Sequence, residues 1–191
     1  MKITAIVGSI RNSNTGSQIG AWVEAQTESV LNSLGGEYGE VQLEVAYLGD
    51  FDLPNGIHEL PPMMQNKQYE DERVTRWSQV IDSSDAFLFV TPEYNHSVPG
   101  PFKNAVDLLG GEWTGKVIGF VGYGFTMGAR AVEHWRQIAS NFEMHDVRSQ
   151  VGIDLASSLD SEGKFTPAEQ HNQQLAATVK SMAKAAHQLA K

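Results

Sequence analysis

Apolar residues in this chain gather in short unbroken runs separated by longer amphipathic stretches. Three runs, Ile3–Val7, Ala86–Val90 and Val117–Val121, each end against polar or glycine-rich sequence. Strands of a parallel sheet covered on both faces read as continuous apolar runs, so these three segments predict buried parallel strands. Val41–Leu48 alternates more and suits a strand nearer the edge of the sheet, and Val147–Leu155 is a weaker fifth candidate.

Helical periodicity lies between these runs. Three segments repeat apolar residues at helical spacings: Ile19, Trp22, Val23, Val30, Leu31 and Leu34; Ala131, Val132, Trp135, Ile138, Ala139 and Phe142; and Leu175, Val179, Met182, Ala186 and Leu189. Thr166-Pro167-Ala168-Glu169 predicts the start of the last helix, as a capping box with proline at the first helical position. Because strand and helix alternate about five times, we expect an α/β fold with helices on both faces of one parallel sheet.

Length, charge and composition favour a single domain and exclude several classes of partner and chemistry. The chain has 191 residues with no repeat or linker, which favours a single domain over residues 1–191. With 23 acidic and 14 basic residues its formal charge is −9, so we expect no nucleic-acid partner and no anionic membrane partner. The absence of cysteine excludes disulfides, thiolate metal sites and catalytic thiols, so any redox chemistry must reside in a bound cofactor. No apolar run approaches the roughly 20 residues that span a bilayer, and Ile3–Val7 is too short for the core of a signal peptide; we expect a cytoplasmic protein.

Two glycine-rich stretches imitate nucleotide-binding motifs. Gly110–Lys116 has the spacing of a phosphate loop, but Val117 follows the lysine where the motif needs Ser or Thr, and the strand comes after it. We therefore interpret this stretch as a turn. Gly122–Gly128 follows a strand and opens a helix, but its last interval is one residue too long for a dinucleotide fingerprint, which makes the match weak. A third unusual stretch, the proline-containing Gly49–Glu70, is long enough to predict a functional or interface loop.

Short polar side chains follow the first predicted strand. Ser9, Ser13, Thr15 and Ser17 lie in the segment that opens the first helix, together with Arg11. Backbone N–H groups at a helix start, with hydroxyl groups beside them, form an anion site, and a planar guanidinium suits phosphate. One hydroxyl residue is enough to cap a helix, so the surplus favours a phosphate site over simple capping.

A rigid polar loop, Thr91–Gly100, follows the third predicted strand. Pro92 and Pro99 fix its backbone on either side of an aromatic and an amide residue, which suits a planar ring with hydrogen-bonding edges. A structural turn with Tyr94 packed on the domain is the alternative. In the doubly wound strand order 2-1-3-4-5 the first and third strands are neighbours, and a crevice opens where their connections part. A phosphate site beside a flat-ring site is what FMN requires, and Tyr123-Gly124-Phe125 would line the next side.

Several motifs resemble those of the NADPH-dependent FMN reductases. They are Gly-Ser-Ile-Arg at 8–11 with Gly16 and Trp22-Val23, Thr-Pro-Glu-Tyr-Asn-His at 91–96 with Pro99 and Lys103-Asn104-Ala105, Glu112-Trp113, Gly115-Lys116, and Tyr123-Gly124 with Gly128 and Arg130-Ala131. The resemblance implies a flavodoxin-like three-layer sandwich with a five-stranded parallel sheet and non-covalently bound FMN. It also implies NADPH or NADH as hydride donor, a small-molecule electron acceptor, and assembly as a homodimer or homotetramer.

The resemblance also implies which residues hold the cofactor. The phosphate loop supplies Ser9, Arg11, Ser13, Asn14, Thr15, Gly16 and Ser17; the ring is flanked by Pro92, Glu93, Tyr94, Asn95 and Ser97, with Tyr123, Gly124 and Phe125 near its other edge. The chain departs from the family at Asn14, where a second arginine or a serine is common. It also departs at Phe125 and Met127, which stand where glycines are usual; two bulky side chains there would narrow the pocket, change its substrate or hinder nicotinamide stacking.

The predicted chemistry is a hydride relay from NAD(P)H through flavin N5 to a quinone, a flavin or a similar small acceptor. Because the flavin carries this chemistry, we predict no catalytic side chain and no metal site. Glu93 is interpreted as an anchor for backbone and charge rather than a proton donor, and His96 either touches substrate or caps the following helix. The alternatives are a non-enzymatic flavodoxin-like electron carrier and an FMN-binding sensor.

Overall fold

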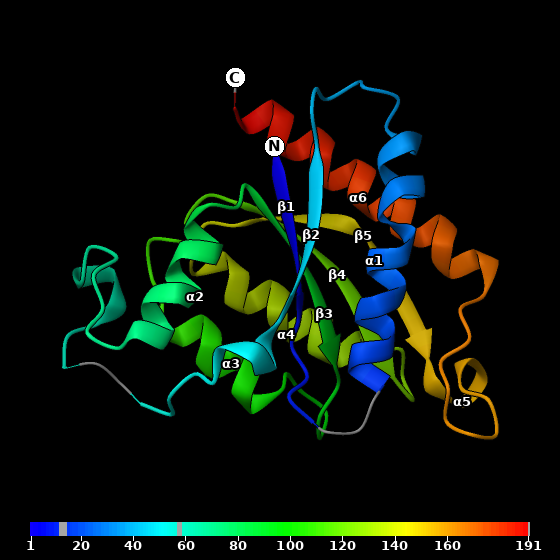
Figure 1. Cartoon of the computed structure of the whole chain (residues 1–191), viewed down its shortest axis with the longest axis horizontal. Coiled ribbons are helices and arrows are strands. Elements are labelled where there is room, and N and C mark those ends of the chain that lie inside the picture. The colour runs from blue at the N-terminus through cyan, green and yellow to red at the C-terminus, as the bar shows by residue number, and fades with distance from the viewer. Residues whose placement is uncertain (12–14, 57–58, 191) are drawn as a thin grey trace.

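Five parallel strands form the centre of the computed structural model, which describes residues 1–11, 15–56 and 59–190 (Figure 1). The strands are β1 (Lys2–Val7), β2 (Gln42–Tyr47), β3 (Ala86–Pro92), β4 (Val117–Gly124) and β5 (His145–Asp154). Their order in the sheet is β2-β1-β3-β4-β5, and each neighbouring pair is parallel. The predicted strand order and the edge position of β2 are therefore confirmed.

Helices cover both faces of the sheet (Figure 1). Helices α1 (Thr15–Ser33) and α6 (Glu169–Leu189) lie on one face, and α2 (Glu72–Asp82), α3 (Gly100–Asp107) and α4 (Ala129–Ser140) lie on the other. Shorter turns are η1 (Leu48–Phe51), η2 (Pro62–Met64) and α5 (Leu155–Ser158). The flavodoxin-like three-layer sandwich expected from the sequence is thus the observed architecture.

The two faces of the sheet are packed by different side chains. In β3, Ala86 and Leu88 belong to a mainly aliphatic cluster under α1 and α6, whereas Phe87 and Phe89 belong to a cluster rich in aromatic residues under α2, α3 and α4. This alternation follows from the two-residue repeat of a strand. The ring of Phe89 lies 5.1 Å from that of Trp135, with an interplanar angle of 87°, an edge-to-face geometry. Rigid aromatic packing therefore fixes α4 against the strands whose carboxyl ends carry the site.

Several element boundaries differ from the sequence expectation. Strands β3 and β4 continue past Val90 and Val121, because the ladder between them extends to Pro92 and Tyr123. The predicted Thr166 cap of the last helix is wrong. The N–H of Thr166 bonds the Ser158 carbonyl at 2.8 Å, which holds it in the preceding loop, and α6 begins only at Glu169.

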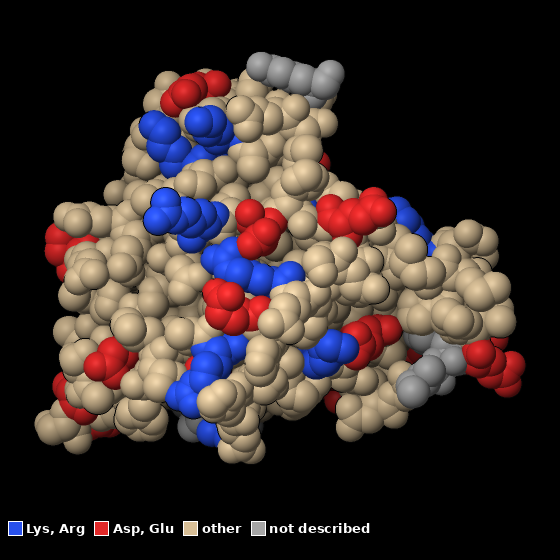
Figure 2. Space-filling view, turned by 180° about the vertical axis from the view of Figure 1, so that it is seen from behind, with Lys and Arg blue, Asp and Glu red and all other residues tan. Residues whose placement is uncertain are grey.

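Two surface properties bear on possible partners, the distribution of charge and the hydropathy of the helices. On the face turned away in Figure 1, Lys and Arg side chains lie among Asp and Glu and form no patch of one sign among the residues drawn in colour (Figure 2). Among the described helices, none combines the length and the apolar content needed to cross a membrane.

Candidate functional site

A cavity of about 440 Å³ lies where the loops after β1, β3 and β4 meet. It is lined by Ser9, Arg11, Thr15, Gly16, Pro92, Glu93, Tyr94, Asn95, His96, Tyr123, Gly124, Phe125, Thr126, Arg130 and Leu155. Strands β1 and β3 are neighbours, and the helices that follow them cover opposite faces of the sheet. This is the switch point at which open α/β sheets bind ligands.

Most of the site residues predicted from the sequence meet in this cavity. They are Ser9, Arg11, Thr15 and Gly16 from the first loop, Pro92, Glu93, Tyr94 and Asn95 from the second, and Tyr123, Gly124 and Phe125 from the third. Ser13 and Asn14 lie outside the described residues. Ser17 is exposed on the first turn of α1 and does not line the cavity. Ser97 does not line it either, and its hydroxyl lies 2.8 Å from Nδ1 of His134, within hydrogen-bond distance.

The first loop meets the start of α1 in close contact. The Ser9 hydroxyl lies 3.1 Å from the Tyr94 hydroxyl, and the Arg11 guanidinium lies 4.0 Å from the centre of the Tyr94 ring. A Cβ on Gly16 would stand 2.7 Å from Cβ of Ser9 and 2.8 Å from the hydroxyl oxygen of Tyr123. Glycine is therefore required for the helix start to approach these groups, and the helix N-terminus with Arg11 gives this end of the cavity a positive potential.

The second loop, after β3, contains a tight turn with two central residues. Tyr94 and Ser97 exchange backbone hydrogen bonds of 3.0 Å in both directions, and the central residues Asn95 and His96 have φ values of 48° and 74°. Two positive φ values are the mark of a type I′ turn, which non-glycine residues adopt at some cost. The turn holds Asn95 and His96 at the rim of the cavity.

A buried carboxylate joins the second loop to the third. The Glu93 side chain is 8% exposed and forms an ion pair with Nε of Arg130 at 2.9 Å. It also accepts hydrogen bonds from the Thr126 hydroxyl (2.9 Å) and from the Arg130 N–H (3.1 Å). These contacts support the interpretation of Glu93 as an anchor.

His96 belongs to the same network. Nη1 of Arg130 lies 2.6 Å from Nδ1 of His96. Because a guanidinium only donates, Nδ1 of a neutral His96 must accept and Nε2 must carry the proton. Pro99 occupies the N-cap position of α3, so His96 lines the cavity rather than capping that helix.

The side chains of Phe125 and Met127 lie in different places. Phe125 lines the cavity with 81% of its surface exposed. The Cβ of Met127 stands 3.3 Å from the position that a Cβ on Gly152 would take, so Met127 lies against β5 and does not line the cavity. The expectation that both residues narrow the pocket is therefore wrong for Met127.

Thr126, Arg130 and Leu155 are lining residues that the sequence analysis did not place in the site. The opposite charges of Glu93 and Arg130 are visible in the sequence, but they are 37 positions apart and only the pairing of β3 with β4 brings them together. Leu155 follows β5, and no pattern in the sequence marks it.

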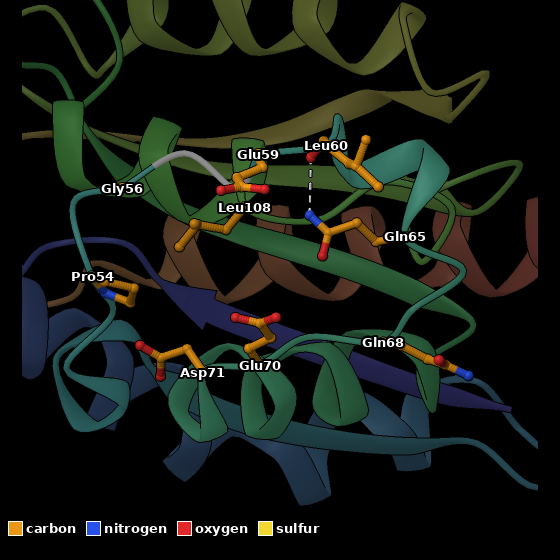
Figure 3. Close-up of a pocket in the computed structure, with 9 residues that line it drawn as sticks. All are labelled: Pro54, Gly56, Glu59, Leu60, Gln65, Gln68, Glu70, Asp71 and Leu108. Atoms are coloured by element: carbon orange, nitrogen blue, oxygen red, sulfur yellow. Dashed lines mark hydrogen bonds between the residues drawn. The ribbon is translucent and has the colours of Figure 1, made fainter.

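A larger cavity of about 560 Å³ lies beside the Gly49–Glu70 loop (Figure 3). Figure 3 shows the carboxylates of Glu70 and Asp71 on one side of it and that of Glu59 on the other. No basic side chain is among the described residues that line it. An acidic cavity repels phosphate, so the cavity with Arg11 and Arg130 is the better site for a phosphorylated ligand, although it is smaller.

The fold and the site define a flavodoxin-like α/β protein with a cavity at the β1/β3 switch point, lined by Arg11 and the start of α1. Residues 1–158 match the family described as NADPH-dependent FMN reductase, and the chain belongs to this family. The resemblance stated from the motifs is thereby confirmed.

Individual relatives agree with this assignment. The chain is similar to the NAD(P)H-dependent FMN reductase ntnL of Nectria sp. (38% identical over 132 residues, 68% of this chain), but the match spans only 63% of that relative. It is also similar to an NAD(P)H:quinone oxidoreductase of Solanum tuberosum (28% identical; 88% of this chain, 84% of the relative). Among solved structures, FerB, a flavoenzyme NAD(P)H:(acceptor) oxidoreductase from Paracoccus denitrificans, has the same fold (TM-score 0.67; 24% identical; 98% of this chain and 97% of that one).

Proposed function

We propose that this protein is an FMN-dependent NAD(P)H oxidoreductase that reduces a small acceptor such as a quinone or a free flavin. The observation that carries the proposal is the meeting, in one cavity, of a cationic helix start and a rigid aromatic and amide loop. Membership of the NADPH-dependent FMN reductase family and the quinone oxidoreductase named among the relatives support the same activity.

The cavity suits FMN at both ends. At the phosphate end, Ser9, Arg11 and the N–H groups at the start of α1 would hold the phosphate. At the ring end, Gly124 has a φ of 155°, and the absence of a side chain there leaves the backbone open to a flat ligand. Bound FMN supplies hydride acceptance and donation, a chemistry that no side chain of this cysteine-free chain provides.

The residues around the ring position act by holding the two loops in place. The Glu93–Arg130 ion pair fixes the second loop against the third, and His96 presents its Nε2–H near the rim. No described residue is needed as nucleophile. Among the described residues there is also no group of three or more acidic or histidine side chains that could hold a metal ion.

Flavin binding and turnover test the proposal together. We expect the flavin-free protein to bind FMN tightly in a fluorescence titration, and the loaded protein to oxidise NADPH or NADH when menadione is present. A protein that binds FMN but transfers no hydride from either nicotinamide would instead be a carrier or a sensor. A protein that binds no FMN would contradict the proposal altogether.

We further propose that the chain forms a homodimer or homotetramer, as one domain per subunit, in the cytoplasm. Exposed apolar side chains support a self-contact: Leu60, Met63 and Met64 are 55%, 61% and 63% exposed in and beside the Gly49–Glu70 loop cavity. Light scattering on a size-exclusion column measures the subunit number directly, and a monomer at all concentrations would contradict this part of the proposal.

A further inference from the structure

One buried hydroxyl group in the cavity wall lacks a hydrogen-bond partner. Tyr123 is 3% exposed, and among the described residues its hydroxyl oxygen is the one buried side-chain polar atom without a well-formed hydrogen bond, although the Ser9 hydroxyl lies near it. Buried polar atoms are almost always paired, because an unpaired one loses its bonds to water without replacement. A buried hydroxyl that forms part of a cavity wall therefore indicates a partner that arrives with a ligand.

The position of this hydroxyl shows which part of a ligand it would meet. Tyr123 belongs to the end of β4, in the segment expected near the edge of the flavin ring, but its side chain reaches the start of α1. The hydroxyl oxygen lies 2.8 Å from the position that a Cβ on Gly16 would occupy, beside Ser9. Helix α1 has 19 residues and no acidic residue in its first turn, so nothing in that turn offsets the attraction of its N-terminus for an anion.

The hydroxyl is also in the right state to donate. Burial raises the pKa of Tyr123, against a smaller opposite effect of the nearby Ser9 hydroxyl and the Arg11 guanidinium, so the phenol keeps its proton at neutral pH. The Ser9 hydroxyl is already within hydrogen-bond distance of the Tyr94 hydroxyl and accepts a 3.4 Å bond from the Arg11 N–H. Tyr123 is thus a protonated donor beside a helix N-terminus.

We propose that the Tyr123 hydroxyl donates a hydrogen bond to the terminal phosphate of bound FMN and so helps the protein to prefer FMN over riboflavin, which has no phosphate. This inference rests on the proposed FMN-dependent function. It assigns Tyr123 to the phosphate end of the site rather than to the ring edge. The two assignments differ in one measurable way, because only a phosphate contact distinguishes the two flavins.

The test removes one oxygen atom. Tyr123→Phe keeps the ring that packs under α1 and deletes only the hydroxyl. With flavin-free full-length protein, titration should show the Kd for FMN rising about 10- to 100-fold, as expected for losing a hydrogen bond to a charged group. The Kd for riboflavin should stay within about twofold of the wild-type value. Tyr38→Phe is the matched control, since Tyr38 is buried against His187 and does not line the cavity.

Thermal melting of the flavin-free proteins gives a second readout. Because the hydroxyl has no well-formed hydrogen bond within the protein, we expect Tyr123→Phe to melt at the wild-type temperature or above it, while the stabilisation gained on adding FMN shrinks. Equal losses of affinity for both flavins, an unchanged Kd for FMN, or a lower melting temperature without flavin would each overturn the inference. If the wild-type protein binds neither flavin, the proposed function itself fails; if it binds FMN and the variant binds equally well, only this inference fails.

Discussion

Replacement of Glu93 by glutamine tests whether this carboxylate anchors the site or delivers a proton. The Glu93 side chain receives three donors, from Nε of Arg130, the N–H of Arg130 and the Thr126 hydroxyl. Glutamine fills the same volume but carries no charge, and its NH₂ group must face either Nε or the backbone N–H of Arg130, both of which only donate. At least one donor therefore loses its acceptor.

The magnitude follows from burial. A hydrogen bond to a charged group contributes about 1.5–3 kcal/mol. Glu93 is 8% exposed but Arg130 is 39% exposed, so solvent screens the pair and places the expected loss near the lower part of that range, at about 2 kcal/mol. For a chain of this size such a loss corresponds to a fall in Tm of about 4–8 °C. The Kd for FMN should rise about tenfold, because the second and third loops are no longer held together by the Glu93 contacts.

Differential scanning calorimetry and FMN titration measure both effects. Glu133→Gln is the matched control, because Glu133 is 69% exposed in its pair with Arg136 on α4 and should cost no more than about 0.5 kcal/mol. If Glu93→Gln keeps the wild-type Tm and FMN affinity but loses turnover, Glu93 is a proton donor and the anchoring argument is refuted.

Four other substitutions test three separate parts of the structure. Gly16→Ala places a methyl group 2.7 and 2.8 Å from neighbouring atoms, so we expect urea unfolding to show a loss of about 1–3 kcal/mol and FMN binding to weaken. Phe125→Ala should leave Tm unchanged, since its ring is 81% exposed, but raise the KM for menadione severalfold in steady-state kinetics. Met127→Ala is the control and should leave this KM unchanged, because Met127 lies against β5. The Arg73 hydrogen bond and charge lower the pKa of Asp71 from 3.8 to about 2, so Asp71 stabilises the fold above about pH 4 and loses this effect as pH falls toward 2. The Tm gap between wild type and Asp71→Asn should shrink steadily over that interval, and a gap that is as large at pH 2 as at pH 7 would contradict the assignment.

Much of the fold could be predicted because parallel strands covered on both faces leave an unbroken apolar signal. The runs at Ile3–Val7, Ala86–Val90 and Val117–Val121 all lie in strands of the sheet. Their outer ends could not be read, because Thr91-Pro92 and Gly122–Gly124 have loop composition and become strand only through pairing with each other. Helix α2 could also have been predicted, because Val74, Trp77 and Ile81 recur at helical spacing.

The loops of the site could be predicted for a different reason. The parallel order sends the ends of β1, β3 and β4 to one edge of the sheet, so polar residues that follow those strands must meet there. Side-chain directions within the loops could not be predicted in the same way. Tyr123 reaches the start of α1, and Glu93 meets Arg130, because of the β3/β4 register and the position of α4, which no local pattern records.

The proposed function requires that one cavity holds FMN where a nicotinamide can reduce it. Anaerobic mixing of the FMN-loaded protein with one equivalent of NADPH, followed by flavin absorbance, tests this claim without any assumption about the acceptor. Our account expects the absorbance of oxidised flavin to disappear in a single turnover and to return when menadione is added. Bound flavin that stays oxidised in the presence of excess NADPH and NADH would contradict it.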